Sequence, residues 1–294
     1  MSQKFRGAIP ALITPFTADN QIDVDGFRRN IEFTIKGGVS AIVPCGTTGE
    51  SATLSSDEHM KVVDIAIESS KVPVIAGTGS NSTDEAVLFT KHAADAGADA
   101  ALVITPYYNK PTQNGLVAHF EKIANATDIP IILYNVPSRT SVDMSVATIA
   151  QLAKHPNIIG IKEATGDMGK ASEIIAKTKD DDFILLSGDD IATLSLMAIG
   201  GTGVISVAAN ILPAKISEMV SLFEKGEMKK AMAIHLELVP IMKTLFIETN
   251  PIPIKTAAGL AGLAAGPLRM PLTPIQPANL EILKAELKKC GVLK

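Results

Sequence analysis

Short apolar runs alternate along the chain with longer stretches in which apolar residues recur every three or four positions. The short runs are rich in β-branched residues, as buried strands are, and the longer stretches have the period of amphipathic helices. The predicted strands are Ala8–Thr14, Ala41–Cys45, Val72–Ala76, Ala100–Thr105, Ile129–Asn135, Ile158–Lys162, Phe183–Ser187 and Gly203–Val207. The predicted helices are Asp23–Lys36, Ser56–Ser70, Ser82–Ala96, Asn114–Ala126, Ser145–Lys154, Lys170–Thr178, Asp190–Ile199 and Pro213–Phe223.

This alternation predicts parallel βαβ units, and eight such strands fit a closed (β/α)₈ TIM barrel. An open α/β sheet is the alternative. A dinucleotide-binding form of that sheet is disfavoured, because no Gly-x-Gly-x-x-Gly motif follows the first predicted strand.

The pattern changes after Phe223, where predicted helices follow one another without strands between them. The predicted elements here are a helix over Gly226–Phe246 with a kink at Pro240, an extended linker over residues 250–253, and helices over Ile254–Leu263 and Ala278–Lys289. We therefore expect a catalytic (β/α)₈ barrel over residues 1–224 and a small helical C-terminal domain over residues 225–294.

The composition narrows the class of protein. The 294 residues are 46% hydrophobic and 20% charged, with a formal net charge of −4. That is enough for a large core, and it offers no basic stripe for nucleic acid. No apolar run reaches the roughly 18 residues of a membrane span, and the N-terminus does not resemble a signal peptide. Cys45 and Cys290 have no metal-ligand or disulfide spacing, which is typical of a reducing cytosol. We expect a soluble cytoplasmic protein with no metal site.

The strand Ile158–Lys162 ends on a lysine that follows three isoleucines and a glycine. Because strand residues alternate faces, Gly160 and Lys162 share one face, and Ile159 and Ile161 share the other. Burial disfavours the charged form of a lysine, and a neutral amine can attack a carbonyl to form a Schiff base. The alternative is a lysine whose head group reaches water past the end of the strand.

Other strand ends carry polar side chains that support the first interpretation. In barrels of this kind the active site lies at the carboxyl ends of the strands. Thr47 and Thr48 stand between two glycines after one strand and could bind an anion, although a plain glycine turn is the alternative. Tyr134 ends the strand before that of Lys162, and a phenol beside an amine is a workable acid–base pair. Arg139 follows in the next loop.

Four motifs together resemble a known family. They are Gly46-Thr47-Thr48-Gly49-Glu50, Tyr107-Tyr108, Tyr134-Asn135-Val136-Pro137-Ser138-Arg139 and Gly160-Ile161-Lys162-Glu163-Ala164. The chain resembles the pyruvate-dependent class I aldolases of the N-acetylneuraminate lyase superfamily over nearly its whole length. Within that family it is most similar to the enzymes that condense pyruvate with aspartate semialdehyde on the path to lysine and diaminopimelate.

The resemblance implies a role for each matching residue. Lys162 would form the Schiff base with pyruvate, with no cofactor. Tyr134 would donate and accept protons through a relay to Thr47 and to Tyr108, and Tyr108 would reach the neighbouring subunit across a tight dimer interface. The resemblance also implies a homotetramer built from two such dimers.

Substrate binding is implied in the same way. Thr48 and the backbone at Ile205 would hold pyruvate, and Arg139 would bind the carboxylate of aspartate semialdehyde. Relatives that cleave N-acetylneuraminate or 2-keto-3-deoxy sugar acids are the main rivals, and Arg139 argues against them because they generally lack it. A non-catalytic binder is expected to have lost Lys162 or Tyr134, and both are present.

Many relatives bind lysine as a feedback inhibitor at a dimer interface. The residues that match this regulatory site are Ser51, Ala52, His59, Asn81, Glu85 and Tyr107. Ser56 departs from the pattern, because some lysine-sensitive bacterial relatives have a histidine there. We therefore expect weak or absent inhibition by lysine.

Overall fold

The computed structural model describes residues 2–293, so the outer ends of the two expected domains, residues 1 and 294, lie outside the described residues. The chain divides into two compact units. The first comprises Pro73–Ile205 with the chain start up to Arg6, and the second comprises Gly7–Val72 with Ser206–Lys294. The expected division at residues 224 and 225 is a different one and stays a prediction.

The first unit is built on parallel strands that pair in chain order. The strands are β2 (Ile75–Gly77), β3 (Ala100–Ile104), β4 (Ile131–Asn135), β5 (Ile158–Glu163), β6 (Ile184–Ser187) and β7 (Gly203–Ser206). The ladders between these neighbouring strands are all parallel. Their residues are almost all buried, because parallel strands are covered on both faces.

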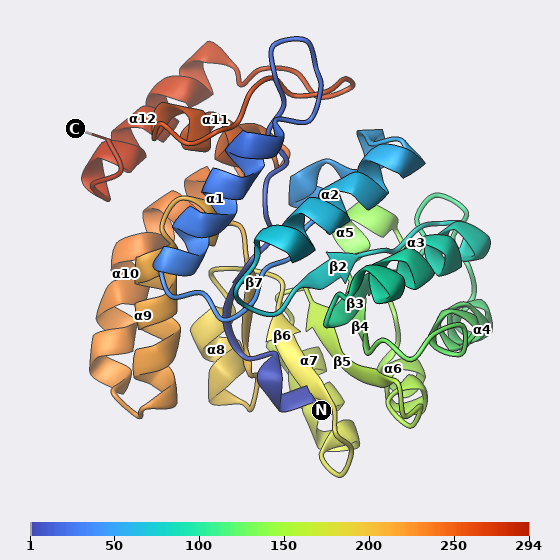
Figure 1. Cartoon of the computed structure of the whole chain (residues 1–294). Coiled ribbons are helices and arrows are strands. Elements are labelled where there is room, and N and C mark those ends of the chain that lie inside the picture. The colour runs from blue at the N-terminus through green and yellow to red at the C-terminus, as the bar shows by residue number, and fades with distance from the viewer. Residues whose placement is uncertain (1, 294) are drawn as a thin grey trace. The chain divides into compact units, whose positions relative to one another are not determined.

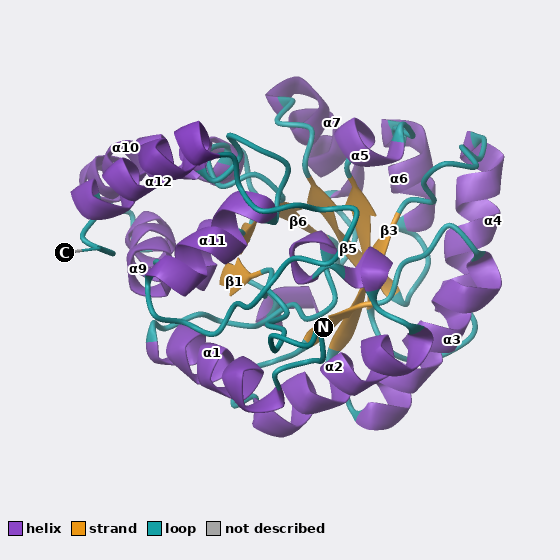
Figure 2. Cartoon of the chain, turned by 90° about the horizontal axis from the view of Figure 1, so that it is seen from above, coloured by secondary structure: helices purple, strands orange, loops and turns teal. Residues whose placement is uncertain are grey.

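Helices connect these strands and cover their outer side (Figure 1, Figure 2). They are α3 (Thr83–Ala96), α4 (Gln113–Ala124), α5 (Pro137–Thr140), α6 (Val146–Leu152), α7 (Met168–Thr178) and α8 (Thr193–Ala198). Most begin at a side-chain cap: Ser82, Thr112, Ser145 and Asp167 each accept a hydrogen bond from the backbone of the first turn. The short helix α5, which begins at Pro137 and carries Arg139, was not among the predicted helices.

The second unit contains β1 (Gly7–Pro10) and mostly helices. They are α1 (Val24–Lys36), α2 (Ser56–Ser69), α9 (Pro213–Glu224), α10 (Met228–Thr244), α11 (Ile252–Leu260) and α12 (Pro277–Lys289), with short 3₁₀ turns at Thr47–Gly49, Ser51–Thr53 and Ala208–Asn210. Ser55 and Glu58 form a capping box at the start of α2. Figure 2 shows α9 to α12 lying together in this unit.

Two sequence predictions about the second unit are wrong. Residues 41–45 do not form a regular strand; Val43 makes only an isolated parallel bridge with Ala11. Pro44 has no N–H to extend the ladder, and Cys45 turns the chain with φ of 54°. The extended linker over residues 250–253 is also wrong, because α11 starts at Ile252 with Pro253 in its first turn, where a missing N–H costs nothing.

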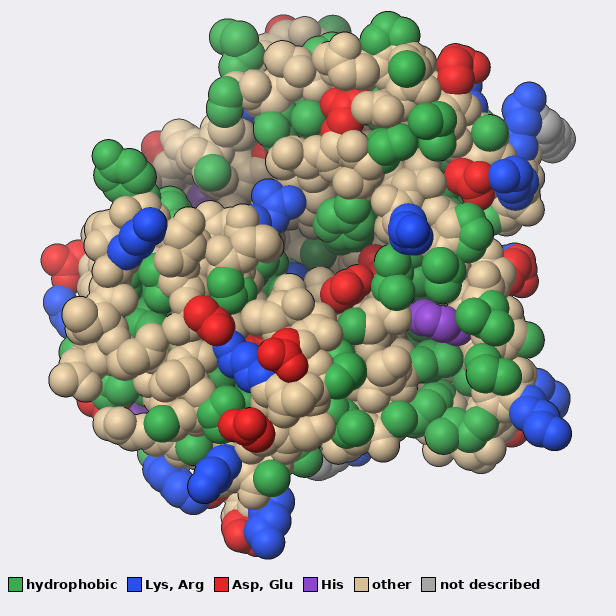
Figure 3. All heavy atoms as spheres, turned by 180° about the vertical axis from the view of Figure 1, so that it is seen from behind, with side chains coloured by type: hydrophobic (Ala, Val, Ile, Leu, Met, Phe, Trp, Pro, Cys, Tyr) green, Lys and Arg blue, Asp and Glu red, His purple; other side chains and the backbone are tan. Residues whose placement is uncertain are grey.

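The surface of α10 carries an apolar stripe. Met228, Met232 and Leu236 are spaced four residues apart and are exposed, and Figure 3 shows hydrophobic side chains gathered over α9 and α10. Pro240 lies inside this helix, at the position where a kink was predicted. Among residues 2–293, no helix combines the length and the apolar composition that crossing a bilayer requires.

Candidate active site

Lys162 and Tyr134 lie opposite each other on neighbouring strands of the first unit. They are register partners in the ladder between β5 and β4, so their side chains leave the same face of the sheet. Lys162 Nζ lies 4.1 Å from the centroid of the Tyr134 ring. Lys162 is only 6% exposed and Tyr134 is buried. The amine therefore lies in the protein interior, against a phenol, rather than in water.

A one-residue irregularity creates this pairing. Ile131 pairs with Ile158, but Ile132 pairs with Gly160, so the register shifts by one between them. Without the shift, Tyr134 would stand opposite Ile161 and on the other face from Lys162. The bulge therefore re-aims the end of β5, which is a common use of bulges next to functional sites.

Glycine leaves room for the lysine side chain. A Cβ built on Gly188, just after β6, would lie 2.5 Å from Ala164 Cβ and 3.1 Å from Lys162 Cε. Any larger residue at 188 would push against the lysine stem. Ile205 is buried on β7, the strand beyond β6 in the same ladder order, so its backbone belongs to the same unit as Lys162.

Arg139 is exposed on α5, directly after β4. The buried hydroxyl of Thr140 accepts a hydrogen bond from Thr105 Oγ1 at 3.3 Å and itself contacts the carbonyls of Val136 and Val142, which ties the short helix to the end of β3. Arg139 is thus the charged group of a loop that leaves the same strand as Tyr134.

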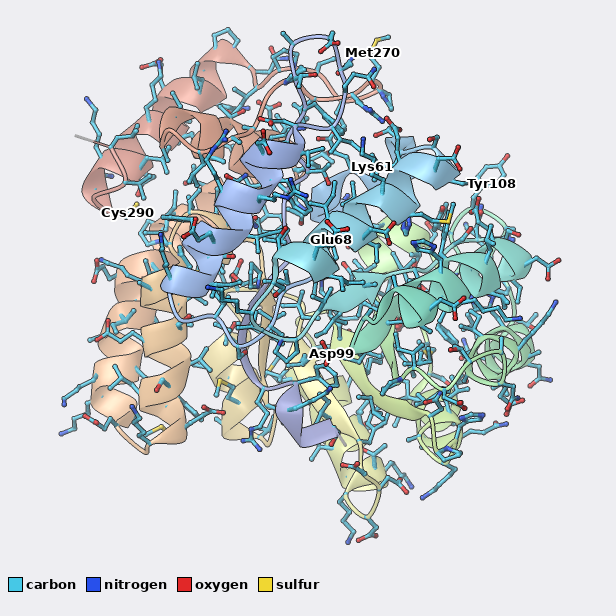
Figure 4. All side chains as sticks on the ribbon, in the orientation of Figure 1. Lys61, Glu68, Asp99, Tyr108, Met270 and Cys290 are labelled. Carbon is cyan, nitrogen blue, oxygen red and sulfur yellow. The ribbon has the colours of Figure 1, made fainter. Side chains whose placement is uncertain are left out.

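Tyr107 and Tyr108 occupy the loop that follows β3. Tyr108 has φ of 71°, a conformation that is strained for a bulky residue, and its side chain is 89% exposed. Asn109 donates to the carbonyl of Asn81 at 2.8 Å and fixes the base of this loop. The result is a tyrosine that points away from its own unit (Figure 4).

The two threonines lie in the second unit, on a 3₁₀ turn between Cys45 and Glu50, both of which have positive φ. Thr48 is buried, and its hydroxyl accepts a hydrogen bond from Asn250 Nδ2 at 3.0 Å. That bond leaves the Thr48 proton available for another acceptor. Gly49 O accepts a hydrogen bond from Thr14 Oγ1 at 2.7 Å, which holds the end of the turn.

A buried ion pair that the sequence analysis missed supports this turn. Lys255 Nζ of α11 lies 2.5 Å from Glu50 Oε1, and each side chain is 1% exposed. Lys255 Nζ also sits 4.0 Å from the centroid of the Phe16 ring. Burial lowers the pKa of Lys255 below its ordinary value. No local pattern indicates this pair, because its partners are 205 residues apart.

Arg269 extends the same network. Its backbone N donates to Glu50 Oε2 at 2.9 Å, and its guanidinium holds Glu58 with two bonds of 2.7 and 2.6 Å. These hydrogen bonds to Arg269 lower the pKa of Glu58 to about 2. Residues from the C-terminal region therefore fix both the threonine turn and the start of α2.

The residues of the expected regulatory site divide between the units. Ser51 and Ala52 lie on a 3₁₀ turn of the second unit and His59 lies buried on α2, with its carbonyl near Cys45 Sγ. Glu85 belongs to the first unit, where its carboxylate accepts a hydrogen bond from Ser80 Oγ at 2.5 Å. Asn81 and Tyr107 belong to that unit too.

A set of polar residues next to Lys162 had no predicted role, although Asn135 and Glu163 stand in two of the family motifs. Asn135 and Glu163, the next register pair along β4 and β5, are both buried and hydrogen-bonded to each other at 2.9 Å. Lys170 and Asp143 complete the set. Of the predicted catalytic residues, the first unit brings Lys162 and Tyr134 into contact; the relay to Thr47 and Tyr108 stays a prediction. Within residues 2–293 no group of three or more His, Cys, Asp or Glu is arranged to hold a metal ion.

Parallel strands with a buried lysine and a tyrosine at adjacent carboxyl ends define a class of enzymes that bind carbonyl substrates as Schiff bases. Residues 4–290 match the model of the Dihydrodipicolinate synthetase family, and the chain belongs to that family.

The chain is 63% identical over 290 residues to 4-hydroxy-tetrahydrodipicolinate synthase of Methanosarcina acetivorans, which covers 99% of this chain and 100% of the relative. It is 62% identical, over the same shares, to the enzyme of that name from Methanosarcina mazei. The crystal structure of dihydrodipicolinate synthase from Aquifex aeolicus superposes with a TM-score of 0.95 at 47% identity, over 98% of this chain and 99% of that one. The predicted fold class, a (β/α)₈ barrel with a helical C-terminal extension, is thereby confirmed.

Proposed function

We propose that this enzyme condenses pyruvate with L-aspartate 4-semialdehyde to give 4-hydroxy-tetrahydrodipicolinate, the first committed step of lysine and diaminopimelate biosynthesis. The observation that carries the proposal is the buried amine of Lys162 against Tyr134, at the carboxyl end of β5. A lysine in this position has few structural uses, because burying an ammonium is costly.

The chemistry begins at the amine. Lys162 Nζ attacks the ketone carbon of pyruvate, and loss of water leaves an imine. The protonated imine withdraws electrons, so the methyl group of pyruvate loses a proton and an enamine forms. The enamine carbon then attacks the aldehyde carbon of the semialdehyde, and a proton is delivered to the new alkoxide. Attack of the substrate's own amino group on the imine carbon closes the ring and releases Lys162.

Proton transfers in these steps fall to Tyr134, the phenol that contacts the lysine, with Thr47 and Tyr108 as further members of the relay. The imine on Lys162 is itself the electron sink, so the reaction needs neither a metal nor an organic cofactor.

Both substrates carry carboxylates, and the chain offers a group for each. The Thr48 hydroxyl, whose oxygen already accepts from Asn250, is the donor for pyruvate, together with the backbone at Ile205. Arg139 receives the carboxylate of the semialdehyde, where a planar guanidinium can form two parallel bonds. A sugar aldehyde would offer hydroxyls there instead.

The exposed Tyr108 supports a homo-oligomeric enzyme. A strained, 89% exposed tyrosine is an unusual surface residue for a monomer, and it suits a tight dimer in which each Tyr108 serves the neighbouring site. Two such dimers make the proposed homotetramer, which we place in the cytoplasm.

The test is a coupled assay in which the following reductase and its reduced nicotinamide report the product. Pyruvate with aspartate semialdehyde is expected to give turnover, and pyruvate with N-acetylmannosamine or glyceraldehyde is expected to give none. Turnover only with a sugar aldehyde would keep the Lys162 and Tyr134 chemistry but overturn the proposed substrate and the role of Arg139.

A further inference from the structure

The side chains one step past Tyr134 and Lys162 form a closed polar ring on the first unit. Asn135 and Glu163 are register partners and are buried. Asn135 Nδ2 donates to Glu163 Oε2 and to Asp143 Oδ1, both at 2.9 Å. Lys170 Nζ bonds to Asp143 and lies 3.7 Å from Glu163 Oε2. These four residues are called the strand-end clamp below.

Asn135 closes the loop that carries Arg139. Its Nδ2 bonds to Asp143 and its Oδ1 accepts from the backbone N of Met144 at 3.0 Å. Both ends of the segment from 135 to 144 are therefore fastened by one side chain, and α5 with Arg139 lies between them.

Glu163, at the end of β5, connects the clamp to the loop that follows this strand. Its Oε1 accepts a hydrogen bond from the backbone N of Thr165 at 2.7 Å, and its Oε2 accepts from Asn135. Two carboxylates that share one amide would repel each other, so the arrangement requires a nearby cation.

Lys170 is that cation, and it is stabilised in an unfavourable position by the two carboxylates. It sits in the first turn of α7, where the helix dipole disfavours positive charge, and its side chain is only 12% exposed. Both costs are offset by the two carboxylates that it faces, Glu163 and Asp143.

We propose that the strand-end clamp positions Arg139 for the carboxylate of the second substrate. Its members are positioning residues, because they act through the Arg139 loop and not on the reacting atoms. The inference rests on the proposed function. It predicts a division of labour: Lys162 and Tyr134 are held by the ladder between β4 and β5, whereas the Arg139 loop is held by the clamp.

The test variant is Lys170→Met, which removes the cation and leaves Glu163 as a carboxylate with almost no access to water. The semialdehyde KM is expected to rise at least about fivefold, because a misplaced guanidinium loses part of a charge-assisted bond. Pyruvate adduct formation, measured by borohydride trapping, is expected to stay within about twofold, since the β4–β5 ladder remains intact. Lys170→Arg keeps the cation and is expected to recover most of the loss.

Lys154→Met is the matched control. Lys154 belongs to the same unit, its side chain is 64% exposed, and its Nζ bonds to Asp181 at 2.9 Å and not to a clamp residue. The Lys154→Met variant is expected to leave the semialdehyde KM and the borohydride trapping of pyruvate unchanged. If Lys170→Met does not fold, Asp143→Asn is the milder variant, because the Asp143 side chain is 55% exposed and the change preserves its shape.

A second measurement does not depend on turnover. Amide hydrogen exchange over residues 136–142 is expected to speed up in Lys170→Met and Asp143→Asn while exchange in β3 stays slow. Unchanged exchange, or a parallel loss of pyruvate trapping and semialdehyde use, would overturn the clamp. Failure of the wild type to use the semialdehyde would instead overturn the proposed function and, with it, the clamp's role in binding that substrate.

Discussion

Replacing Lys255 by Met is expected to destabilise the protein through the partner that it leaves behind. In the wild type, Lys255 Nζ and Glu50 Oε1 are 2.5 Å apart and both side chains are 1% exposed. Met fills nearly the same space, so the variant creates little cavity. Glu50 keeps the hydrogen bond from Arg269 N at 2.9 Å and the longer-range attraction of the Arg269 guanidinium, but it loses the ammonium in direct contact with it.

The expected cost follows from the loss of that direct ion-pair partner. Breaking a buried ion pair by removing one partner costs about 3–5 kcal/mol, whereas replacing both partners together is often neutral. In the double variant Lys255→Met/Glu50→Gln, the Gln carbonyl still accepts from Arg269 N. We therefore expect a loss of about 4 kcal/mol in the single variant and less than about 1 kcal/mol in the double variant.

The assay is urea unfolding near neutral pH, at one protein concentration for all variants, with KM for pyruvate measured on the same preparations. Lys215→Met is the matched control, because Lys215 pairs with Glu237 on the surface of the same unit. KM for pyruvate is expected to rise in Lys255→Met, since Glu50 ends the turn that carries Thr48, and to recover in the double variant. A single variant within about 1 kcal/mol of the wild type, or a double variant no more stable than the single one, would show that the Lys255–Glu50 pair does not support this unit in the way described.

Four further predictions test the site and the fold. Arg139→Ala is expected to raise the semialdehyde KM at least about tenfold and to leave borohydride trapping of pyruvate unchanged, because it removes a charged bond to one substrate only; equal damage to both would contradict its role. Tyr108→Phe is expected to slow turnover, and dilution of the wild type to monomers, followed by sedimentation, should mimic that loss; a fully active monomer speaks against the shared site. Lysine titration is expected to give weak inhibition because of Ser56, with any residual response abolished in Glu85→Ala, and strong inhibition at low lysine would reverse this. Burial lowers the pKa of His119 from 6.5 to about 4. Between pH 6.5 and pH 4 the imidazole is therefore protonated in the unfolded chain but neutral in the native state. Stability should therefore fall by about 1.4 kcal/mol per unit as pH drops from 6.5 towards 4, and urea unfolding of His119→Gln should lack that slope.

The positions of several candidate site residues in their strands and loops could be predicted from the sequence, because such a position is a local property. A β-branched run that ends on a lysine predicts both the strand and the place of Lys162 at its end. Tyr134 was placed in the same way, at the end of an apolar run, whereas the role expected of Arg139 in the next loop came from the family resemblance. Most helices of the first unit were likewise predicted within a few residues, because their caps, such as Ser82 and Thr112, stand next to the pattern that they start.

The supporting residues could not be found in this way. Glu163 and Asn135 look like ordinary strand ends, and only the ladder between β4 and β5 brings them together. Lys170 looks like an ordinary helix residue in the sequence. Its position in the first turn of α7, where the helix dipole disfavours a cation, was the one available sign of a nearby anion. Lys255 gave none.

Consecutive residues are enough to predict the alternation of strands and helices, the family and the residue types at the strand ends, because periodicity and motifs are local. Strand register and the pairing of buried charges are visible only in the folded chain. The register shift after Ile131 places Tyr134 opposite Lys162, and packing across 205 residues joins Lys255 to Glu50. The physical reason is the same in both cases: register and the pairing of buried charges depend on which segments meet, and no local pattern encodes that meeting.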